Sequence, residues 1–199
     1  PWTWSICRWL PGSALHVTEP DDWGAAAEAL GAFVAALHRP APAGAPHNPF
    51  RGVPLAQRDE RFRLTLERAP GWVDAAAASA LWDRALALPP AAGPPVWLHG
   101  DLHPLNVLVD GGRVSAVVDF GDVCAGDRAT DLALAWIALP TDVRAGFRET
   151  AGAVEPIDDT TWLRSRAWAL ALGLAYLQGA GDVAAIGARA VRESLADAT

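Results

Sequence analysis

The stretch HGDLHPLNVLVDGGRVSAVVDFGD, residues 99–122, holds two polar clusters that are separated by two apolar segments. The apolar segments, Val107–Val109 and Val114–Val118, predict two short strands. Asp110-Gly111-Gly112 lies between them and supplies the turn, because glycine accepts the positive φ that tight hairpin turns need. A hairpin brings its two ends together, so we expect the two polar clusters to meet at one point in space.

Three side chains of these clusters, Asp101, Asn106 and Asp119, are therefore expected to share one site. Asp and Asn oxygens suit a hard cation such as Mg²⁺, which takes few protein ligands and leaves room for phosphate oxygens. A carboxylate that is not on the metal can orient a substrate hydroxyl and accept its proton. This combination indicates phosphoryl transfer. The competing interpretation is a buried hairpin whose Asp and Asn residues only cap turns.

The motif HGD-x-x-x-x-N followed by DFGD resembles the catalytic and metal-binding loops of the aminoglycoside phosphotransferase family, which is related to the protein kinases. Protein kinases have Arg at the position of Gly100, so the resemblance is to the small-molecule branch. The usual family form is HGDLHPGN, and Leu105 replaces its glycine, a difference that we expect to be tolerated. The family pattern GDP-x-x-DLA matches residues 126–133, with Arg128 in place of Pro.

This resemblance implies a role for each motif residue. Asp101 is the expected catalytic base, and Asn106 and Asp119 are the expected Mg²⁺ ligands. His99 is expected to be a structural residue behind the catalytic loop, and Asp131 to brace that loop from below.

The resemblance also implies contacts to a nucleotide, either ATP or GTP. Arg8 and Leu10 would offer the backbone groups of a hinge that recognises adenine, although an ordinary edge strand explains the same residues. His103 stands where protein kinases often have a Lys that approaches the γ-phosphate, and its alternative role is a loop-stabilising donor. The implied acceptor is a hydroxyl of a small molecule, for example an antibiotic such as an aminoglycoside.

The implied fold is α+β and mainly helical, the C-terminal lobe of a protein-kinase-like fold with a catalytic β-hairpin. Residues 1–12 are expected to form one remnant N-lobe strand, Trp2–Trp9, and a hinge, and residues 13–199 the helical lobe. The chain has no Lys, and no glycine-rich hairpin precedes residue 99, although kinase-type enzymes hold nucleotide phosphates with both. We therefore expect a portion of a longer enzyme that is inactive by itself.

Apolar periodicity predicts most of the remaining elements. Asp21 and Asp22 precede a helix whose N-terminus acidic residues suit, Asp74 is an expected N-cap, and Asp158-Asp159-Thr160 is an expected N-cap cluster. Leu64 and Leu66 are expected on the apolar side of their helix. The Pro- and Gly-rich residues 40–49 predict a connector. A short buried strand is expected at Val96–Leu98, and helices at about 23–38, 55–69, 74–88, 132–139, 141–153, 158–178 and 182–196.

Composition excludes several classes of protein. The net charge of −7 argues against a nucleic-acid-binding protein. The longest apolar run, Ala167–Leu177, is too short to span a bilayer, and no signal peptide is visible, so we expect a cytoplasmic protein without a membrane partner. Cys7 and Cys124 make no disulfide framework. Nothing in the sequence indicates an oligomeric state.

Two other functions remain open at this point. His99, Asp101 and His103 alternate, so they could ligate one Zn²⁺ in a metal-dependent hydrolase, but DFGD would then be unexplained. A kinase-like lobe without its nucleotide clamp could instead be a non-catalytic binding module. Acidic residues beside the last helices could face a cationic acceptor, or could serve only in capping and solvation, namely Glu155, Asp158 and Asp159.

Overall fold

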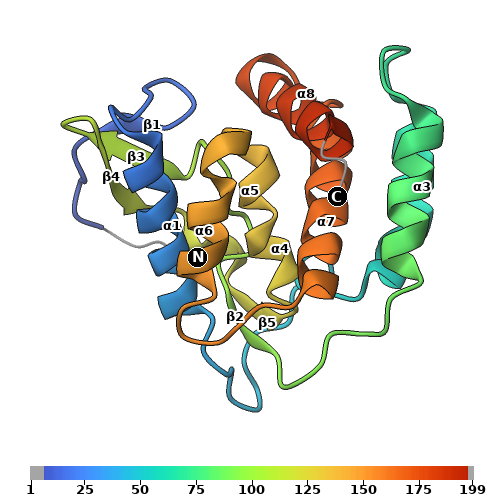
Figure 1. The fold of residues 1–199 in the computed structure, drawn as a ribbon, viewed down its shortest axis with the longest axis horizontal. Coiled ribbons are helices and arrows are strands. Elements are labelled where there is room, and N and C mark those ends of the chain that lie inside the picture. Colours follow the sequence, from blue (N-terminus) through green and yellow to red (C-terminus); the bar gives the residue numbers. More distant parts are fainter. Residues whose placement is uncertain (1–6, 197–199) are drawn as a thin grey trace, which may run out of the picture.

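The computed structural model describes residues 7–196, and about half of them lie in helices (Figure 1). The strands are β1 Ser13–Ala14, β2 Val96–Leu98, β3 Val107–Asp110, β4 Arg113–Val117 and β5 Cys124–Gly126. The helices are α1 Trp23–Leu37, α2 Asp59–Glu67, α3 Ala75–Leu86, α4 Ala129–Leu132, α5 Leu134–Ile137, α6 Arg144–Ala151, α7 Asp159–Tyr176 and α8 Gly181–Ala196. Three 3₁₀ turns complete the set, η1 Leu55–Arg58, η2 Phe120–Asp122 and η3 Thr141–Val143.

The predicted hairpin is formed by β3 and β4, which pair antiparallel from Val107↔Val117 to Asp110↔Arg113. Gly111 and Gly112 make the two-residue turn, with φ of 55° and 73°. Positive φ at both central positions belongs to the type I′ turn that suits the twist of paired strands. β1 adds to the free edge of β3, while β2 pairs separately with β5, a strand that the sequence did not predict.

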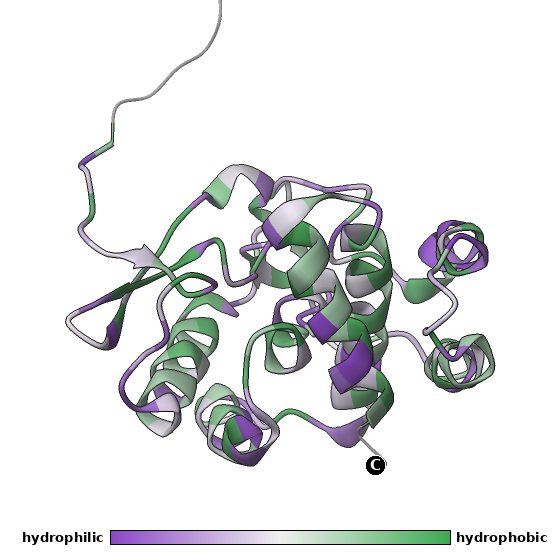
Figure 2. Ribbon diagram, turned by 90° about the horizontal axis from the view of Figure 1, so that it is seen from above, coloured by the Kyte–Doolittle hydropathy of each residue, from purple (hydrophilic) through white to green (hydrophobic). Residues whose placement is uncertain are grey.

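The core lies where α7 packs against α3, α4 and α8, while α1 packs against α6 (Figure 1). Figure 2 shows hydrophobic residues concentrated in the helices of the interior and hydrophilic residues along the outer turns and loops. α7 buries residues around its whole circumference, including Arg164 and Arg166. Both guanidinium groups have partners, because Arg164 Nε donates to Asp127 Oδ2 at 2.8 Å and Arg166 Nε to Ser194 O at 2.7 Å. A helix buried on all sides can carry charge only when the charge is paired in this way.

The predicted helix starts are confirmed at three aspartates. Asp22 accepts a hydrogen bond from the backbone N–H of Ala25, and Asp74 from that of Ala77. Asp158 accepts from the backbone N–H of Thr161 at 2.6 Å. Each side chain satisfies an N–H group that the first turn of its helix leaves without a partner.

Several sequence expectations are wrong in detail. The expected strand 2–9 lies mostly outside the described residues, and its described end, Cys7–Trp9, is not in a strand. Leu64 is 40% exposed, because Phe62, Thr65 and Leu66 are the buried face of α2. The single helix expected at 132–139 is instead two short helices, α4 and α5, and the helices expected at 55–69 and 141–153 each begin with a 3₁₀ turn.

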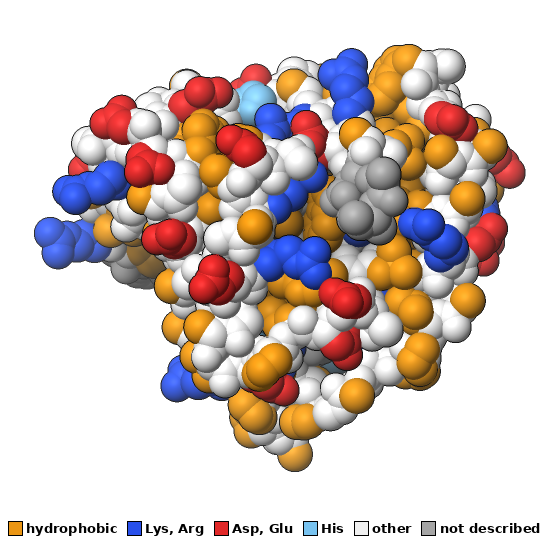
Figure 3. Space-filling model, viewed as in Figure 1, with side chains coloured by type: hydrophobic (Ala, Val, Ile, Leu, Met, Phe, Trp, Pro, Cys, Tyr) orange, Lys and Arg blue, Asp and Glu red, His pale blue; other side chains and the backbone are white. Residues whose placement is uncertain are grey.

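The surface carries charges of both signs. Figure 3 shows basic and acidic side chains interspersed on the face seen in Figure 1, without a large field of one sign. No helix within residues 7–196 is long and apolar enough to cross a membrane.

Candidate active site

The loop that follows β2 is held from α4 by a buried carboxylate. Asp131 Oδ2 accepts from the backbone N–H of His99 at 2.8 Å, and Asp131 Oδ1 from that of Gly100 at 2.9 Å. His38 Nε2 lies 3.3 Å from Asp131 Oδ2 and ties the end of α1 to the same group. Asp131 is fully buried, so these three donors replace the water that its charge has lost.

The side chain of His99 joins this loop to the end of the hairpin. Its Nδ1 accepts from the backbone N–H of Asp101 at 3.2 Å, so Nε2 carries the proton and donates to Val118 O at 2.9 Å. The backbone N–H of Val118 in turn donates to Asn106 O at 2.9 Å. These contacts bring the segment before Asp119 next to the loop that carries Asp101 and Asn106, as the hairpin predicted.

Asp101 receives donors from three different parts of the chain. Arg51 Nη2 donates to Oδ1 at 3.1 Å, the Tyr176 hydroxyl donates to Oδ1 at 3.4 Å, and His103 Nε2 lies 3.2 Å from Oδ2. Burial opposes ionisation of Asp101, but His103 and the Arg51 guanidinium outweigh it and lower the pKa of the carboxyl to about 2. Asp101 is therefore a carboxylate at neutral pH, as an acceptor of a hydroxyl proton must be.

The pKa of the Tyr176 phenol is raised, whereas that of the neighbouring Asp101 is lowered. Burial raises the pKa of Tyr176, and the nearby charge of Asp101 raises that pKa further. The hydroxyl of Tyr176 thus remains a neutral donor.

Asn106 and Asp119 each have a side-chain oxygen of the kind that Mg²⁺ binds. The Asn106 amide donates through Nδ2 to Asp101 O at 2.9 Å, which leaves the amide oxygen available as a ligand. Asp119 is the only residue other than glycine with a positive φ within 7–196, at 62°. Such strained backbone concentrates at functional sites. Its side chain accepts only from Gly121 N, at 3.3 Å, among the described residues.

The zinc hydrolase interpretation is wrong. No group of three or more His, Cys, Asp or Glu side chains in the described part of the chain is arranged to hold a metal ion. His99 uses both ring nitrogens in hydrogen bonds, and His103 Nδ1 accepts from Leu105 N at 3.2 Å while Nε2 faces Asp101. A site with one Asp and one Asn oxygen instead suits Mg²⁺, which fills its remaining positions with water and phosphate.

Arg8 and Leu10 are exposed and lie in an irregular segment. Their proposed contact with adenine stays a prediction, as does the contact of His103 with the γ-phosphate. His103 itself lies within the site, at Asp101.

Sequence reasoning missed two residues of the site, Arg51 and Tyr176. Arg51 is 50 residues from Asp101 in the sequence, and nothing local in its Pro- and Gly-rich neighbourhood indicates the contact. Tyr176 left a signal, because it is the only tyrosine of the chain and its hydroxyl ends the otherwise apolar segment 167–175 of helix α7.

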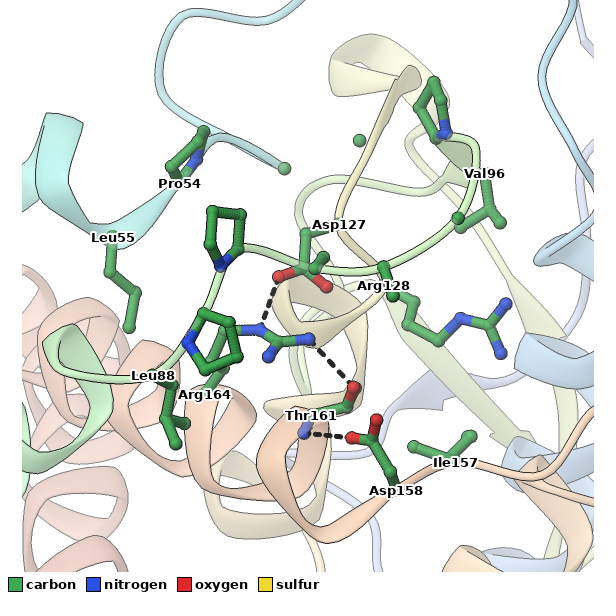
Figure 4. Close-up of a pocket in the computed structure, with 18 of the residues that line it drawn as sticks. Pro54, Leu55, Leu88, Val96, Asp127, Arg128, Ile157, Asp158, Thr161 and Arg164 are labelled. Carbon is green, nitrogen blue, oxygen red and sulfur yellow. Dashed lines mark hydrogen bonds and ion pairs between the residues drawn. The ribbon is translucent and has the colours of Figure 1, made fainter.

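A pocket of about 620 Å³ lies elsewhere, between residues 89–95, η1 and the start of α7. No residue of 99–122 lines it. Its charged groups are already paired, since Arg164 contacts Asp127 and Thr161 while Asp158 caps Thr161 (Figure 4). The charged side chains that line this pocket thus contact other residues of the fold.

Two acidic residues proposed to face a cationic acceptor are likewise paired. Arg128 Nη2 lies 2.5 Å from Glu155 Oε2, and Arg148 Nη2 lies 3.2 Å from Asp159 Oδ1. With Asp158 at its helix cap, each of the three acidic residues has a partner within the fold, and their contact with a cationic acceptor stays a prediction.

Comparison with known proteins identifies the family. A model of the phosphotransferase enzyme family matches residues 1–168. The chain belongs to this family. It is 30% identical over 142 residues to an aminoglycoside 3'-phosphotransferase of Escherichia coli, which covers 68% of the chain and 52% of that relative. An aminoglycoside 3'-phosphotransferase of Salmonella typhimurium matches to the same extent. The chain thus spans about half the length of the curated relatives it matches.

Solved structures of several phosphotransferases share the fold of this chain. The GDP and kanamycin complex of APH(2")-IIia has a TM-score of 0.64 and 19% identity, covering 95% of this chain and 69% of that chain. The apoenzyme of macrolide 2'-phosphotransferase MphH from Brachybacterium faecium has a TM-score of 0.58 and 24% identity, covering 95% and 72%. The predicted kinship with kinase-like small-molecule phosphotransferases is confirmed.

Proposed function

We propose that the complete gene product transfers the γ-phosphoryl group of ATP or GTP to a hydroxyl of a small molecule. The observation that supports this proposal is the backbone contact of Val118 N with Asn106 O, which brings the segment before the strained Asp119 next to the loop of Asp101 and Asn106, in a member of a phosphotransferase family. Asn106 and Asp119 would bind the metal ion, and Asp101 would bind the acceptor hydroxyl, as the corresponding groups do in phosphoryl transfer.

Asp101 acts on the acceptor. Its carboxylate accepts a hydrogen bond from the acceptor hydroxyl and turns the hydroxyl oxygen toward the γ-phosphorus. As the new O–P bond forms and the bond to the β-phosphate oxygen breaks, the hydroxyl proton passes to Asp101. Holding these atoms in line supplies most of the rate acceleration, because the reaction needs little other help from the protein.

Asn106 and Asp119 would hold Mg²⁺ through the amide oxygen and the carboxylate. The ion, when bound, neutralises charge on the β- and γ-phosphate oxygens. Asn106 is fixed for this purpose by its bond to Asp101 O, and Asp119 by the left-handed backbone that aims its side chain.

His99 and Asp131 support the site without touching a substrate. Asp131 fixes the backbone of His99 and Gly100, and His99 fixes Val118. Together they set the separation between the Asp101 loop and the Asp119 loop. The reaction depends on this separation, because a small misplacement of a reacting group lowers the rate strongly.

The acceptor we propose to test first is an aminoglycoside. The relatives with 30% identity are named aminoglycoside 3'-phosphotransferases. Net charge also supports this choice, because a chain of charge −7 attracts a cationic acceptor at long range.

The experiment incubates the complete gene product with MgATP or MgGTP and, separately, kanamycin, spectinomycin, hygromycin B or a macrolide. Mass spectrometry then detects the gain of one phosphoryl group. We expect phosphorylation of at least one acceptor and its loss when EDTA removes Mg²⁺. Tight nucleotide binding without transfer to any acceptor would contradict the proposal and favour a non-catalytic binding module.

A further inference from the structure

Arg51 lies between the two loops of the site. Its Nη2 donates to Asp101 Oδ1 at 3.1 Å, and its Nε lies 3.9 Å from Asp122 Oδ2. The side chain is 17% exposed, and its buried Nε finds no hydrogen-bond partner among the described residues. One guanidinium thus holds the carboxylate of the catalytic loop and stands beside the carboxylate of the DFGD segment.

The backbone that carries Arg51 is fixed. Gly52 has φ of 65°, and a Cβ on it would come within 2.6 Å of Leu98 Cδ1 and 2.9 Å of Gly126 Cα. Gly52 N donates to Thr130 Oγ1 at 3.0 Å, and Gly52 O accepts from Asp127 N at 2.9 Å. The guanidinium therefore reaches Asp101 from an anchored segment, and only its side-chain torsions can move it.

The contacts around Asp101 differ between its two oxygens. Oδ1 accepts from both Arg51 and Tyr176, which fills the two lone pairs of that oxygen. Oδ2 accepts only from His103 within residues 7–196, so one lone pair of Oδ2 remains free. An acceptor hydroxyl that leaves these bonds in place can reach the carboxylate only at Oδ2.

We propose that Arg51 is a positioning residue for phosphoryl transfer, which holds Asp101 through Oδ1 so that Oδ2 receives the acceptor hydroxyl. This inference rests on the proposed function. Arginine suits the task because its planar guanidinium is always protonated and presents several N–H groups in fixed directions. Lysine would offer a point charge without those directions.

The test measures kcat and the acceptor KM of the complete gene product, using the acceptor that the mass-spectrometric panel identifies. Arg51→Gln should lower kcat by about 100-fold, because misplacement of a reacting group by about 1 Å costs a factor of that order. The acceptor KM should change by less than about threefold, because the lost interaction orients Asp101 and does not bind the acceptor. Added guanidinium ions should restore part of kcat in Arg51→Gln.

Two further variants separate positioning from folding and from charge alone. Arg51→Lys keeps the charge and the fold, and we expect it to melt like the wild type with kcat reduced by about tenfold or more. Arg58→Gln removes a neighbouring cation that lies over the ring of Phe50 and not at Asp101, and it should retain the kcat of the wild type.

Wild-type kcat in Arg51→Gln or in Arg51→Lys would overturn the assignment of Arg51 alone. The assignment would also be overturned if guanidinium did not restore the kcat of Arg51→Gln and Arg58→Gln lost kcat to the same extent. Absence of transfer by the wild type would instead overturn the proposed function.

Discussion

The backbone of Gly100 lies against that of Asp122, so closely that a Cβ on Gly100 would stand 2.4 Å from the carbonyl oxygen of Asp122. Gly100 also has φ of 85°, which L side chains rarely adopt. The glycine of HGD is thus the point where the catalytic loop meets the DFGD segment. A larger residue there would push the two loops apart.

Gly100→Ala is expected to lower stability by more than about 2 kcal/mol, because positive φ strain adds to the clash with Asp122. Gly44→Ala is the matched control, since Gly44 has φ of 92° but nothing within 4 Å of an added Cβ. Gly44→Ala should lower stability by about 1 kcal/mol, because it introduces the backbone strain of a positive φ without a clash. Thermal unfolding of both variants measures the difference, and equal losses would contradict the close approach.

Asp131→Ala should destabilise the fold by roughly 3 kcal/mol, because it leaves two buried N–H groups, those of His99 and Gly100, without an acceptor. Asp142→Ala, at an exposed carboxylate, serves as the control and should change stability little. Urea unfolding compares the two variants. A small effect of Asp131→Ala would show that the loop does not depend on this carboxylate.

The two cysteines should differ in reactivity. Burial, with the carboxylates of Asp131 and Asp122, raises the pKa of Cys124 to about 11, so its thiolate is scarce at pH 8. Cys7 is exposed. Iodoacetamide should label Cys7 in the native protein, and Cys124 only after unfolding in guanidinium. Peptide mapping reads the sites, and rapid native labelling of Cys124 would contradict its burial.

The helix cap at Asp158 makes the stability of the fold depend on pH in a predictable direction. Hydrogen bonds from the Thr161 backbone lower the pKa of Asp158 from 3.8, so the folded state favours its ionised form. The resulting stability is present above the unfolded pKa and is lost as pH falls through the folded pKa. Asp158→Ala should cost about 1 kcal/mol at pH 7 and less at pH 2.

Asp158→Asn is the control for this pH dependence, because Asn caps a helix without a titrating charge. Melting temperatures of the wild type and both variants across this pH range provide the measurement. A difference between the wild type and Asp158→Ala that did not shrink on acidification would contradict the role of the ionised cap.

The hairpin and the helix caps could be predicted from the sequence because their causes are local. Gly111-Gly112 forms a two-residue turn by itself, and an Asp before an apolar helical period caps the nearest N–H groups. Because that turn is short, the segment before Asp119 returns to the loop of Asp101 and Asn106, where Val118 N donates to Asn106 O, so this approach of the two loops followed from the same local rules.

The pairing of β2 with β5 and the contact of Arg51 with Asp101 could not be predicted in this way. Both depend on how distant segments pack, and the residues 40–49 that precede Arg51 have no periodicity. Hydrogen bonds with distant partners nevertheless hold that connector, as Pro46 O accepts from Ala125 N at 2.9 Å. The interruption between α4 and α5 at Ala133 likewise has no signal in its Ala- and Leu-rich sequence.

The most direct test of the site is the rate of acceptor phosphorylation by Asp101→Asn in the complete gene product. We expect the rate to fall by about 10³-fold at saturating MgATP or MgGTP, with the melting temperature of the wild type retained. Asp110→Asn, at the exposed hairpin turn, should keep the full rate. A folded Asp101→Asn that transferred phosphate at the rate of the wild type would show that Asp101 is not the catalytic base.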